Sequence, residues 1–215
     1  MAPHVFLLSP AYCGGRRATY LLRDGSQLPL AQRLAEGTLT LGEAFAFMSG
    51  LYFRGKLTYA RHFAAAAEAP IFVITPTRGL QSPDSPVSAR LLREFATVDV
   101  HADDRRYRTP LDRDLGKLAR TLPAQSRVVL LGSIATGKYV DVLTRALGER
   151  LHYPAAFVGR GDMSRGGLML RCVDDGVELD YTPLVPDARR HGARPPRLEP
   201  RKFNVQRSKF KPVDS

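Results

Sequence analysis

The sequence predicts a three-layer α/β domain, with a mostly parallel sheet and helices on both of its faces. Short apolar runs, such as residues 5–8 and 71–74, alternate along the chain with longer segments that have helical spacing of apolar residues. Strands that alternate with helices indicate βαβ units, whose strands pair in parallel. The length of 215 residues suits one domain of this kind plus an extension.

The strands are predicted where apolar runs end at Gly, Pro or polar residues. The predicted strands are residues 4–9, 70–75, 98–100, 127–131 and 155–158. The first run is a buried strand and not a signal peptide, because Ser9 and Pro10 interrupt it and no basic segment precedes it.

The helices are predicted where apolar residues recur at helical spacing. The predicted helices are residues 28–36, 41–48, 56–68, 88–97, 110–122 and 134–150. Thr40 and Glu43 have the spacing of a capping box, which predicts where the second of these helices begins. Gly50 and Gly55 are expected to interrupt the chain between the second and the third.

The C-terminal part divides into a hairpin and a tail. Residues 168–173 and 177–181, joined by Asp174-Asp175-Gly176, have the pattern of a β-hairpin. Residues 186–215 contain five prolines and few apolar residues, so we expect a disordered basic tail. The predicted domains are therefore an α/β domain over residues 1–185 and this tail.

Composition and charge indicate the compartment and the kind of partner. The net charge is +11, and the tail, with nine Lys or Arg and three Asp or Glu, carries +6 of it. Such a basic balance favours nucleic acid, nucleotides or acidic surfaces as partners. No apolar run approaches the length of about 20 residues that a membrane-spanning helix needs. Cys13 and Cys172 form no disulfide framework, and without an export signal we expect reduced thiols in the cytoplasm.

The segments that follow the predicted strands are rich in Gly, hydroxyl and basic residues. Ligands of open parallel sheets bind beyond the carboxyl ends of the strands, where backbone N–H groups and Arg side chains favour oxyanions. We therefore expect an anion-binding cleft at this edge, with Arg16, Arg78 and Arg160 lining one site. The expected ligand-binding residues are Ser9, Gly14, Gly15, Arg16, Arg17, Thr75, Arg78, Gly132, Ser133, Thr136, Lys138, Arg160 and Arg165.

The segment after the fourth strand has Walker A spacing. Gly132, Gly137 and Lys138 match the motif, which follows an apolar strand and opens a helix as a P-loop does. Tyr139, however, stands where Ser or Thr would bind magnesium. The interpretation favoured here is an anion site at a helix start, and not a nucleotide-hydrolysing P-loop.

Three residues are candidates for catalysis. Cys13 lies near Arg16 and Arg17, whose charges would lower the thiol pKa and favour a nucleophilic thiolate, although a small loop residue is the simpler interpretation. Asp84 and Asp162 lie in loops rich in Gly, Pro and Ser and are candidates for acid–base chemistry, with solvated turn caps as the alternative. No spacing of His, Cys and Asp resembles a metal site, and no cofactor is expected.

Residues 49–61 mix aromatic and basic side chains. Aromatic rings can stack on bases while cations contact phosphate. The alternative is a core helix in which Leu51, Phe53 and Leu57 are buried and only Arg54 and Lys56 face outward.

A family resemblance adds to this interpretation. A Ser-x-Leu-Tyr-Phe block, a following Tyr-Ala and a strand that runs into Gly-Leu resemble a family of uncharacterised bacterial and phage α/β domains. The matching residues are Ser49, Leu51, Tyr52, Tyr59, Ala60, Ile74, Gly79 and Leu80. Thr77-Arg78 replaces the Lys-His of that family. The resemblance covers residues 4–145. Members of that family are distantly similar to uracil-DNA-glycosylase-like folds, whose catalytic motifs this chain lacks. It implies a nucleic-acid setting without an activity.

The predicted function is binding of nucleic acid or nucleotide phosphate, with action on nucleic acid or a nucleobase as an extension. One alternative is a small-molecule nucleotide or nucleoside transferase or hydrolase that uses Asp84 or Asp162. A second is a non-catalytic interaction protein with a basic docking tail. The sequence does not decide whether the protein is an enzyme, and it identifies no protein partner.

The substitution of Tyr139 for a magnesium ligand has a measurable consequence. We predict that the purified protein releases no phosphate from ATP in the presence of Mg²⁺, because the hydroxyl that would hold the metal is missing. A steady-state phosphate-release assay on the wild-type protein and on Lys138→Ala checks this. Mg²⁺-dependent release that Lys138→Ala abolishes would restore the P-loop interpretation.

Overall fold

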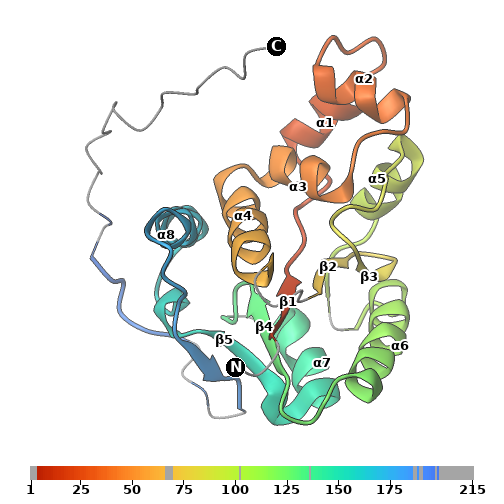
Figure 1. The fold of residues 1–215 in the computed structure, drawn as a ribbon. Coiled ribbons are helices and arrows are strands. Elements are labelled where there is room, and N and C mark those ends of the chain that lie inside the picture. Colours follow the sequence, from red (N-terminus) through yellow and green to blue (C-terminus); the bar gives the residue numbers. More distant parts are fainter. Residues whose placement is uncertain are drawn as a thin grey trace, which may run out of the picture.

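The computed structural model describes residues 4–65, 70–101, 103–135, 137–185, 188, 191–196 and 198. It contains a six-stranded sheet in the order β3-β2-β1-β4-β5-β6 (Figure 1). The strands are β1 (His4–Leu8), β2 (Ile71–Thr75), β3 (Gly79–Gln81), β4 (Arg127–Leu131), β5 (Leu151–Pro154) and β6 (Tyr181–Pro183). The four central strands are parallel, and β3 and β6 add antiparallel edges. The predicted α/β class with a mostly parallel sheet is confirmed.

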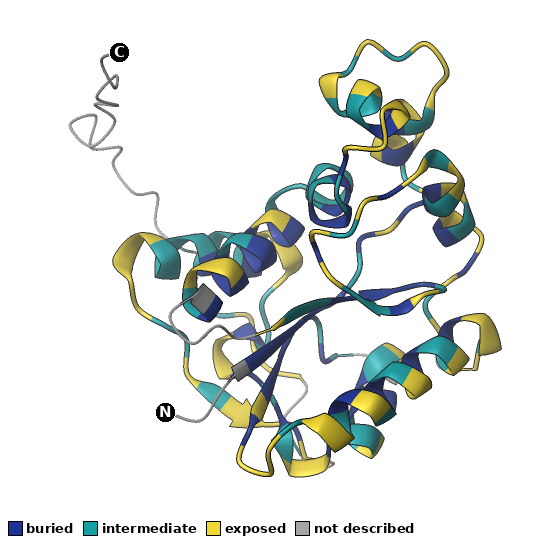
Figure 2. Cartoon of the chain, turned by 45° about the vertical axis from the view of Figure 1, so that its right-hand side comes forward, coloured by how far each residue is buried: buried dark blue, intermediate teal, exposed yellow. Residues whose placement is uncertain are grey.

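The central strand β1 is buried on both faces, as its continuous apolar sequence predicts. Phe6 and Leu8 belong to one core, whereas Val5 and Leu7 belong to the other. Figure 2 shows the central strands as the most buried part of the molecule. The alternation of β1 side chains therefore joins two cores into one three-layer domain.

Helices cover both faces of the sheet. On the first face lie α3 (Leu41–Ser49), α4 (Leu51–Ala65), α5 (Ala89–Ala96) and α8 (Asp162–Asp175), with α1 (Arg16–Leu22) and α2 (Pro29–Ala35) further out. On the second lie α6 (Arg105–Thr121) and α7 (Gly137–Leu147). The short 3₁₀ helices are η1 (Gly148–Arg150) and η2 (Ala155–Phe157). None of the helices in the described ranges combines the length and apolar character that a membrane crossing requires.

The predicted capping box at the start of α3 is confirmed. The Thr40 side chain accepts a hydrogen bond from the Glu43 backbone N–H, and the Glu43 carboxylate accepts one from the Thr40 backbone N–H. Arg33 of α2 donates to both Glu43 oxygens at 2.6 and 2.9 Å. This hydrogen bonding with Arg33 lowers the pKa of Glu43 to about 2. The same two hydrogen bonds join α2 to the start of α3.

The predicted C-terminal hairpin is wrong. Residues 168–173 lie in the fourteen-residue helix α8, and only residues 181–183 form a strand. An apolar run of this length fits a buried helix face as well as a strand, and Met169 is buried against the first core. Gly176, which was expected in a hairpin turn, has φ 65° and ends α8 as its left-handed cap.

Other boundaries also differ from the prediction. Residues 98–100 form no strand, because Val98 and Val100 pack against the second core without a strand partner. The fifth strand is β5, directly before the predicted residues 155–158, which begin as η2. The strand β3 is absent from the predicted strands. Of the predicted tail, only residues 188, 191–196 and 198 are described, and the Ala193 carbonyl packs against Gly159; the rest of 186–215 lies outside the described residues.

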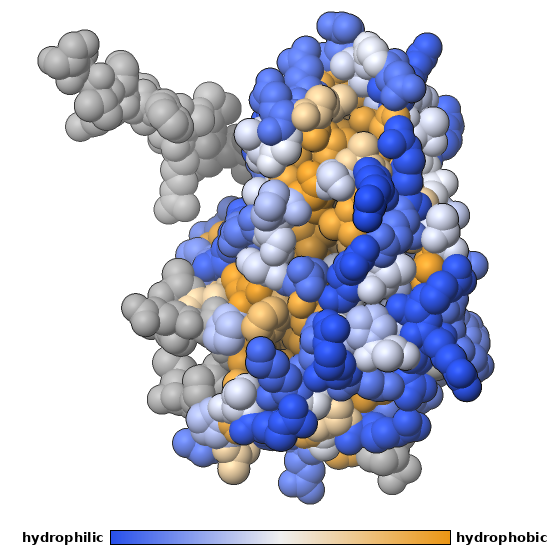
Figure 3. Space-filling model, turned by 90° about the vertical axis from the view of Figure 1, so that its right-hand side faces the viewer, coloured by the Kyte–Doolittle hydropathy of each residue, from blue (hydrophilic) through white to orange (hydrophobic). Residues whose placement is uncertain are grey.

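The side of the molecule that α5 and α6 face carries apolar surface in recesses (Figure 3). Hydrophilic side chains stand around these recesses and account for most of the visible surface. Large hydrophobic side chains that are well exposed are few in the described ranges: Tyr12, Tyr20, Met163, Val177 and Val185. The surface is thus that of an ordinary globular domain.

Two glycines allow α4 and α8 to touch backbone to backbone. A Cβ on Gly166 would lie 2.7 Å from the Leu51 carbonyl oxygen, and one on Gly55 would lie 2.7 Å from the Gly166 carbonyl oxygen. Gly55 therefore lies inside α4 and does not interrupt it, contrary to the sequence prediction.

We predict that Gly166→Ala lowers the free energy of unfolding by about 1–3 kcal/mol, because the helices must separate to admit the methyl group. The matched control is Gly116→Ala in α6, where a Cβ meets only the tip of Arg120 at 3.5 Å. That control should be neutral or stabilising by up to about 1 kcal/mol, since Ala favours a helix over Gly. Chemical denaturation measures both, and equal effects of the two variants would contradict the close contact.

Candidate functional site

The sheet has a topological switch point between β1 and β4. The helices after β1 cover the first face, whereas α7, which follows β4, covers the second. Ligands of open α/β sheets bind at the carboxyl ends of the strands beside such a point. Ser9 and Gly132 follow the two strands, and a Cβ on Gly132 would lie 2.9 Å from the Ser9 Cβ. The glycine thus permits the two strand ends to approach closely.

A fully buried lysine points at this position. Lys56 of α4 has no exposed surface, and its Nζ donates to the Ser9 carbonyl at 2.6 Å and to Ser9 Oγ at 2.8 Å. The amine also lies 4.4 Å and 4.8 Å from the ring centroids of Tyr52 and Phe53. The expectation that Lys56 faces outward is therefore wrong. Its spacing from Phe53 and Ala60 places it on the buried face of α4, a pattern visible in the sequence.

Burial dominates the electrostatics of this group. Desolvation lowers the pKa of Lys56 to about 7, while the charge of Asp162 opposes the decrease and that of Arg165 adds to it. Burial also raises the pKa of Tyr139, which a hydrogen bond with Ser9 opposes. Ser9 therefore lies between a fully buried amine and a half-buried phenol.

Arg165 is the second buried cation at this edge. Its guanidinium donates to the Phe157 carbonyl at 3.2 Å and to Asp162 at 3.2 Å. The Tyr52 hydroxyl is buried beside Arg165. Burial raises the pKa of that hydroxyl. The predicted ligand residue Arg165 is consequently a positioning group beneath the surface, held by its own helix and by η2.

A cavity of about 180 Å³ opens at the switch point, and we call it the switch-point pocket. It is lined by Pro10, Ala11, Tyr12, Cys13, Pro76, Phe95, Val98, Asp99, Val100, Lys138 and Tyr139. These residues come from the segments after β1 and β2, from the end of α5 and from the first turn of α7. Parallel pairing thus brings distant segments together, as the sequence analysis expected.

The prediction of a reactive Cys13 thiolate is contradicted. Cys13 is buried, and burial raises its thiol pKa to about 12. The cations expected to lower this pKa do not act on it, since Arg17 donates to the Phe47 carbonyl at 3.1 Å and Arg16 is exposed. Cys13 instead lines the switch-point pocket.

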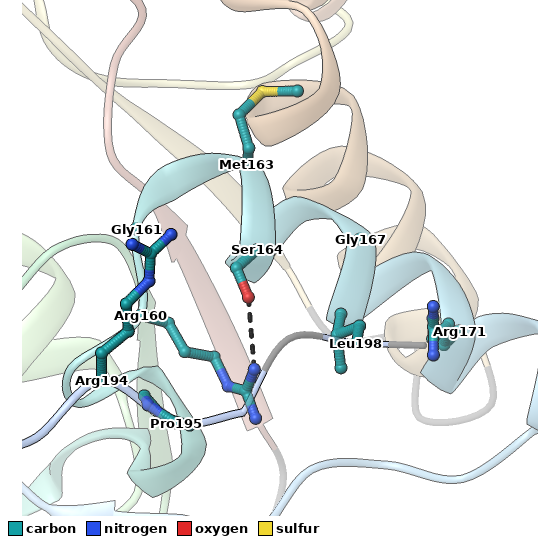
Figure 4. Close-up of a pocket in the computed structure, with 9 residues that line it drawn as sticks. All are labelled: Arg160, Gly161, Met163, Ser164, Gly167, Arg171, Arg194, Pro195 and Leu198. Carbon is teal, nitrogen blue, oxygen red and sulfur yellow. Dashed lines mark hydrogen bonds between the residues drawn. The ribbon is translucent and has the colours of Figure 1, made fainter. Parts of the chain in front are cut away.

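A larger cavity of about 380 Å³ lies beside α8, and we call it the arginine cavity (Figure 4). Its lining residues are Arg160, Gly161, Met163, Ser164, Gly167, Arg171, Arg194, Pro195 and Leu198. Arg160 donates to the Ala156 carbonyl at 3.0 Å and to Ser164 Oγ at 3.2 Å. Among the described residues, three arginines and no acidic residue line this cavity, which makes it suited to an anion.

Other predicted site residues lie elsewhere. Arg78 pairs with Glu94 at 2.6 Å and lines a separate cavity. The expectation that Arg78 and Arg160 line one site is therefore wrong. The Thr75 hydroxyl donates to the Gly79 carbonyl at 2.9 Å and accepts from the Arg78 backbone N–H at 3.0 Å, which closes the β2–β3 turn.

The loop residues have local partners. Asp84 is exposed and forms an ion pair with Arg61, away from both cavities. Gly14 and Gly15 lie beneath the Tyr12 ring. Ser133 accepts from the Ala135 backbone N–H at 3.4 Å. Thr136 lies outside the described residues.

Comparison of the chain with protein-family models, curated proteins and solved structures gives no match. The family resemblance seen in the sequence therefore stays a prediction. Within the described ranges, no three His, Cys, Asp or Glu side chains lie close enough together to hold a metal ion.

The buried amine of Lys56 makes stability depend on pH. Between pH 7 and the ordinary lysine value of 10.5, the unfolded chain binds a proton that the folded protein does not. Raising the pH therefore stabilises the folded state, by at most about 1.4 kcal/mol per pH unit.

We predict that wild-type protein gains stability relative to Lys56→Met as the pH rises from 7 to 9. Chemical denaturation of both proteins at pH 6, 7, 8 and 9 measures the free energy of unfolding of each. Groups other than Lys56 titrate alike in the two proteins, so their contributions cancel in the difference. Parallel curves for the two proteins would show that Lys56 stays charged throughout.

Proposed function

We propose that the protein binds phosphate groups of nucleic acid or of a nucleotide at the carboxyl edge of its sheet. The observation that carries the proposal is the arginine cavity, whose described lining contains Arg160, Arg171 and Arg194 and no acidic residue. Guanidinium groups bind phosphate through paired N–H donors, and several donors on one oxyanion reinforce one another. A net charge of +11 adds long-range attraction for the same ligands.

The cavity is organised before any ligand arrives. The two hydrogen bonds of Arg160, to a carbonyl of η2 and to Ser164 of α8, hold its guanidinium at the cavity wall. Gly161 is the N-cap of α8, so backbone N–H groups of the first turn also point to this end of the cavity. Side chains fixed in this way lose little entropy on binding.

An enzyme of the transferase or hydrolase class is the second candidate, favoured by the contact between Lys56 Nζ and Ser9 Oγ. A lysine with a pKa near 7 beside a serine hydroxyl resembles a base and its nucleophile. Ser9 is only 3% exposed and does not line the switch-point pocket. Phosphate binding at the open arginine cavity is therefore the better supported function. The interaction-protein alternative depends on a tail that lies largely outside the described residues.

We predict that Arg160→Ala and Arg194→Ala each weaken binding of a fluorescein-labelled single-stranded oligonucleotide by about tenfold. Each should also reduce the slope of log affinity against log salt by about 0.7, the value for one lost phosphate contact on a single strand. Fluorescence anisotropy at several salt concentrations measures both quantities.

The control is Arg127→Ala, which removes an exposed arginine from the amino end of β4, at the opposite edge of the sheet. This variant carries the same change in net charge and should bind as the wild type does. An equal loss in all three variants would mean that only total charge matters, and unchanged binding by Arg160→Ala and Arg194→Ala would refute the site.

A further inference from the structure

We propose that the switch-point pocket binds a single guanine base, stacked on Tyr12 and recognised by Asp99, with Lys138 on the attached phosphate. The inference deepens the proposed function and rests on it, because it names the nucleotide that the phosphate-binding edge selects. It uses three side chains from three different segments of the chain, which meet only in this pocket.

The Tyr12 ring is placed so that a base can stack on it. Its side chain is 69% exposed, an unusual state for so large a ring, although it belongs to the pocket wall. The Gly14-Gly15 backbone supports the ring from one side: a Cβ on Gly14 would lie 2.6 Å from the Tyr12 hydroxyl oxygen, and one on Gly15 would lie 3.5 Å from its Cδ1. Gly14 is thus needed for this position of the ring, whereas a side chain at residue 15 would make only an ordinary contact with it. Exposed aromatic rings of this kind stack on nucleic-acid bases.

The remaining walls suit one planar ring system. Phe95 and Val98 are buried and apolar, and Pro10 and Pro76 add apolar surface. A volume of about 180 Å³ admits one base and excludes a base pair. The ligand is therefore a free nucleotide or an unpaired base of a single strand, and not an intact duplex.

Asp99 sets the identity of the base. It is the only acidic residue in the pocket lining, it is exposed, and it forms no ion pair with another residue in the described ranges. A carboxylate accepts two hydrogen bonds side by side. Guanine presents two adjacent donors, N1–H and the N2 amino group, whereas adenine and cytosine place an acceptor beside their amino group. An acceptor facing a carboxylate is repelled, so guanine is the base that fits.

Lys138 completes the site with a charge for phosphate. It lies in the first turn of α7, it is exposed, and it too forms no ion pair with a described residue. The Walker-like segment thus retains a phosphate-binding role in this proposal without a magnesium ligand. Because Lys138 contacts only the phosphate, its contribution vanishes when the ligand is an uncharged nucleoside.

The test is isothermal titration calorimetry of the full chain with GMP, IMP, AMP and guanosine. IMP lacks only the N2 amino group of GMP and should bind about tenfold more weakly, as the loss of one hydrogen bond to a charged group predicts. AMP should bind more weakly still. Equal affinities for GMP and AMP would overturn the proposal.

Four variants assign the three roles. Asp99→Asn should remove the preference for GMP over AMP, and Tyr12→Ala should weaken all purine nucleotides by about tenfold or more while Tyr12→Phe does not. Lys138→Ala should weaken GMP and leave guanosine unchanged. The matched controls are Tyr20→Ala and Asp24→Asn, which remove an exposed ring and an exposed carboxylate outside the pocket and should have no effect. A guanine preference that survives Asp99→Asn refutes the recognition step.

The two proposals fail in different ways. If GMP does not bind but oligonucleotide binding still depends on Arg160 and Arg194, the base pocket is refuted and the proposed function stands. If GMP binds with the expected dependence on Asp99 but the arginine variants bind oligonucleotide normally, the arginine cavity is refuted and the pocket stands. Unchanged GMP affinity in Tyr12→Ala and Lys138→Ala would place the nucleotide elsewhere and refute the pocket.

Discussion

The hydrogen bonds from the Lys56 amine to Ser9 fix the part of the structure on which the candidate site depends. An amine with no exposed surface must find acceptors, because burying it unpaired would be costly. The carbonyl and hydroxyl of Ser9 supply them at 2.6 and 2.8 Å, and this sets the position of α4 over the end of β1. The next residue toward the N-terminus, Gly55, touches α8 through its backbone. One turn of α4 thus connects the sheet edge on one side with the helix of the arginine cavity on the other.

The order of the strands explains why the switch-point pocket lies where it does. Since β1 and β4 are neighbours whose following helices cover opposite faces, the chain leaves a gap at their carboxyl ends that side chains must line. Lys138 reaches this gap from α7 on the second face, whereas Lys56 and Arg165 lie beneath it on the first. Arg160 enters its cavity just before α8 begins. Cations therefore gather at one edge although their segments are far apart in sequence.

The sequence predicted those features that local chemistry determines. The apolar β1, the capping box of Thr40 and Glu43 and the α/β class follow from periodicity and from residues three positions apart, and the structure confirms them. Features that depend on distant partners were missed. The run around Met169 fits a strand or a helix until α4 packs against it, and the burial of Lys56 depends on Ser9, 47 residues away. Cys13 was misjudged for the same reason, because desolvation by the fold outweighs charges that are near only in sequence. The ion pair of Arg78 with Glu94, 16 residues away, is another feature that local patterns do not predict.

The two proposed cavities differ in chemistry in the way that nucleic-acid recognition requires. The arginine cavity offers three guanidinium groups beside apolar residues such as Met163 and Leu198, and contacts of guanidinium groups with phosphate give affinity without information about sequence. The switch-point pocket offers an aromatic ring, apolar walls and one carboxylate, and such contacts distinguish one base from another. A chain with +11 net charge attracts every polyanion, so its positive charge does not distinguish one base from another. Selectivity for a base has to come from a pocket that contains a negatively charged hydrogen-bond acceptor. Asp99, an acidic residue in the lining of a pocket at an otherwise basic edge, is the group that satisfies this requirement: it repels phosphate and accepts only a ligand that brings its own N–H donors.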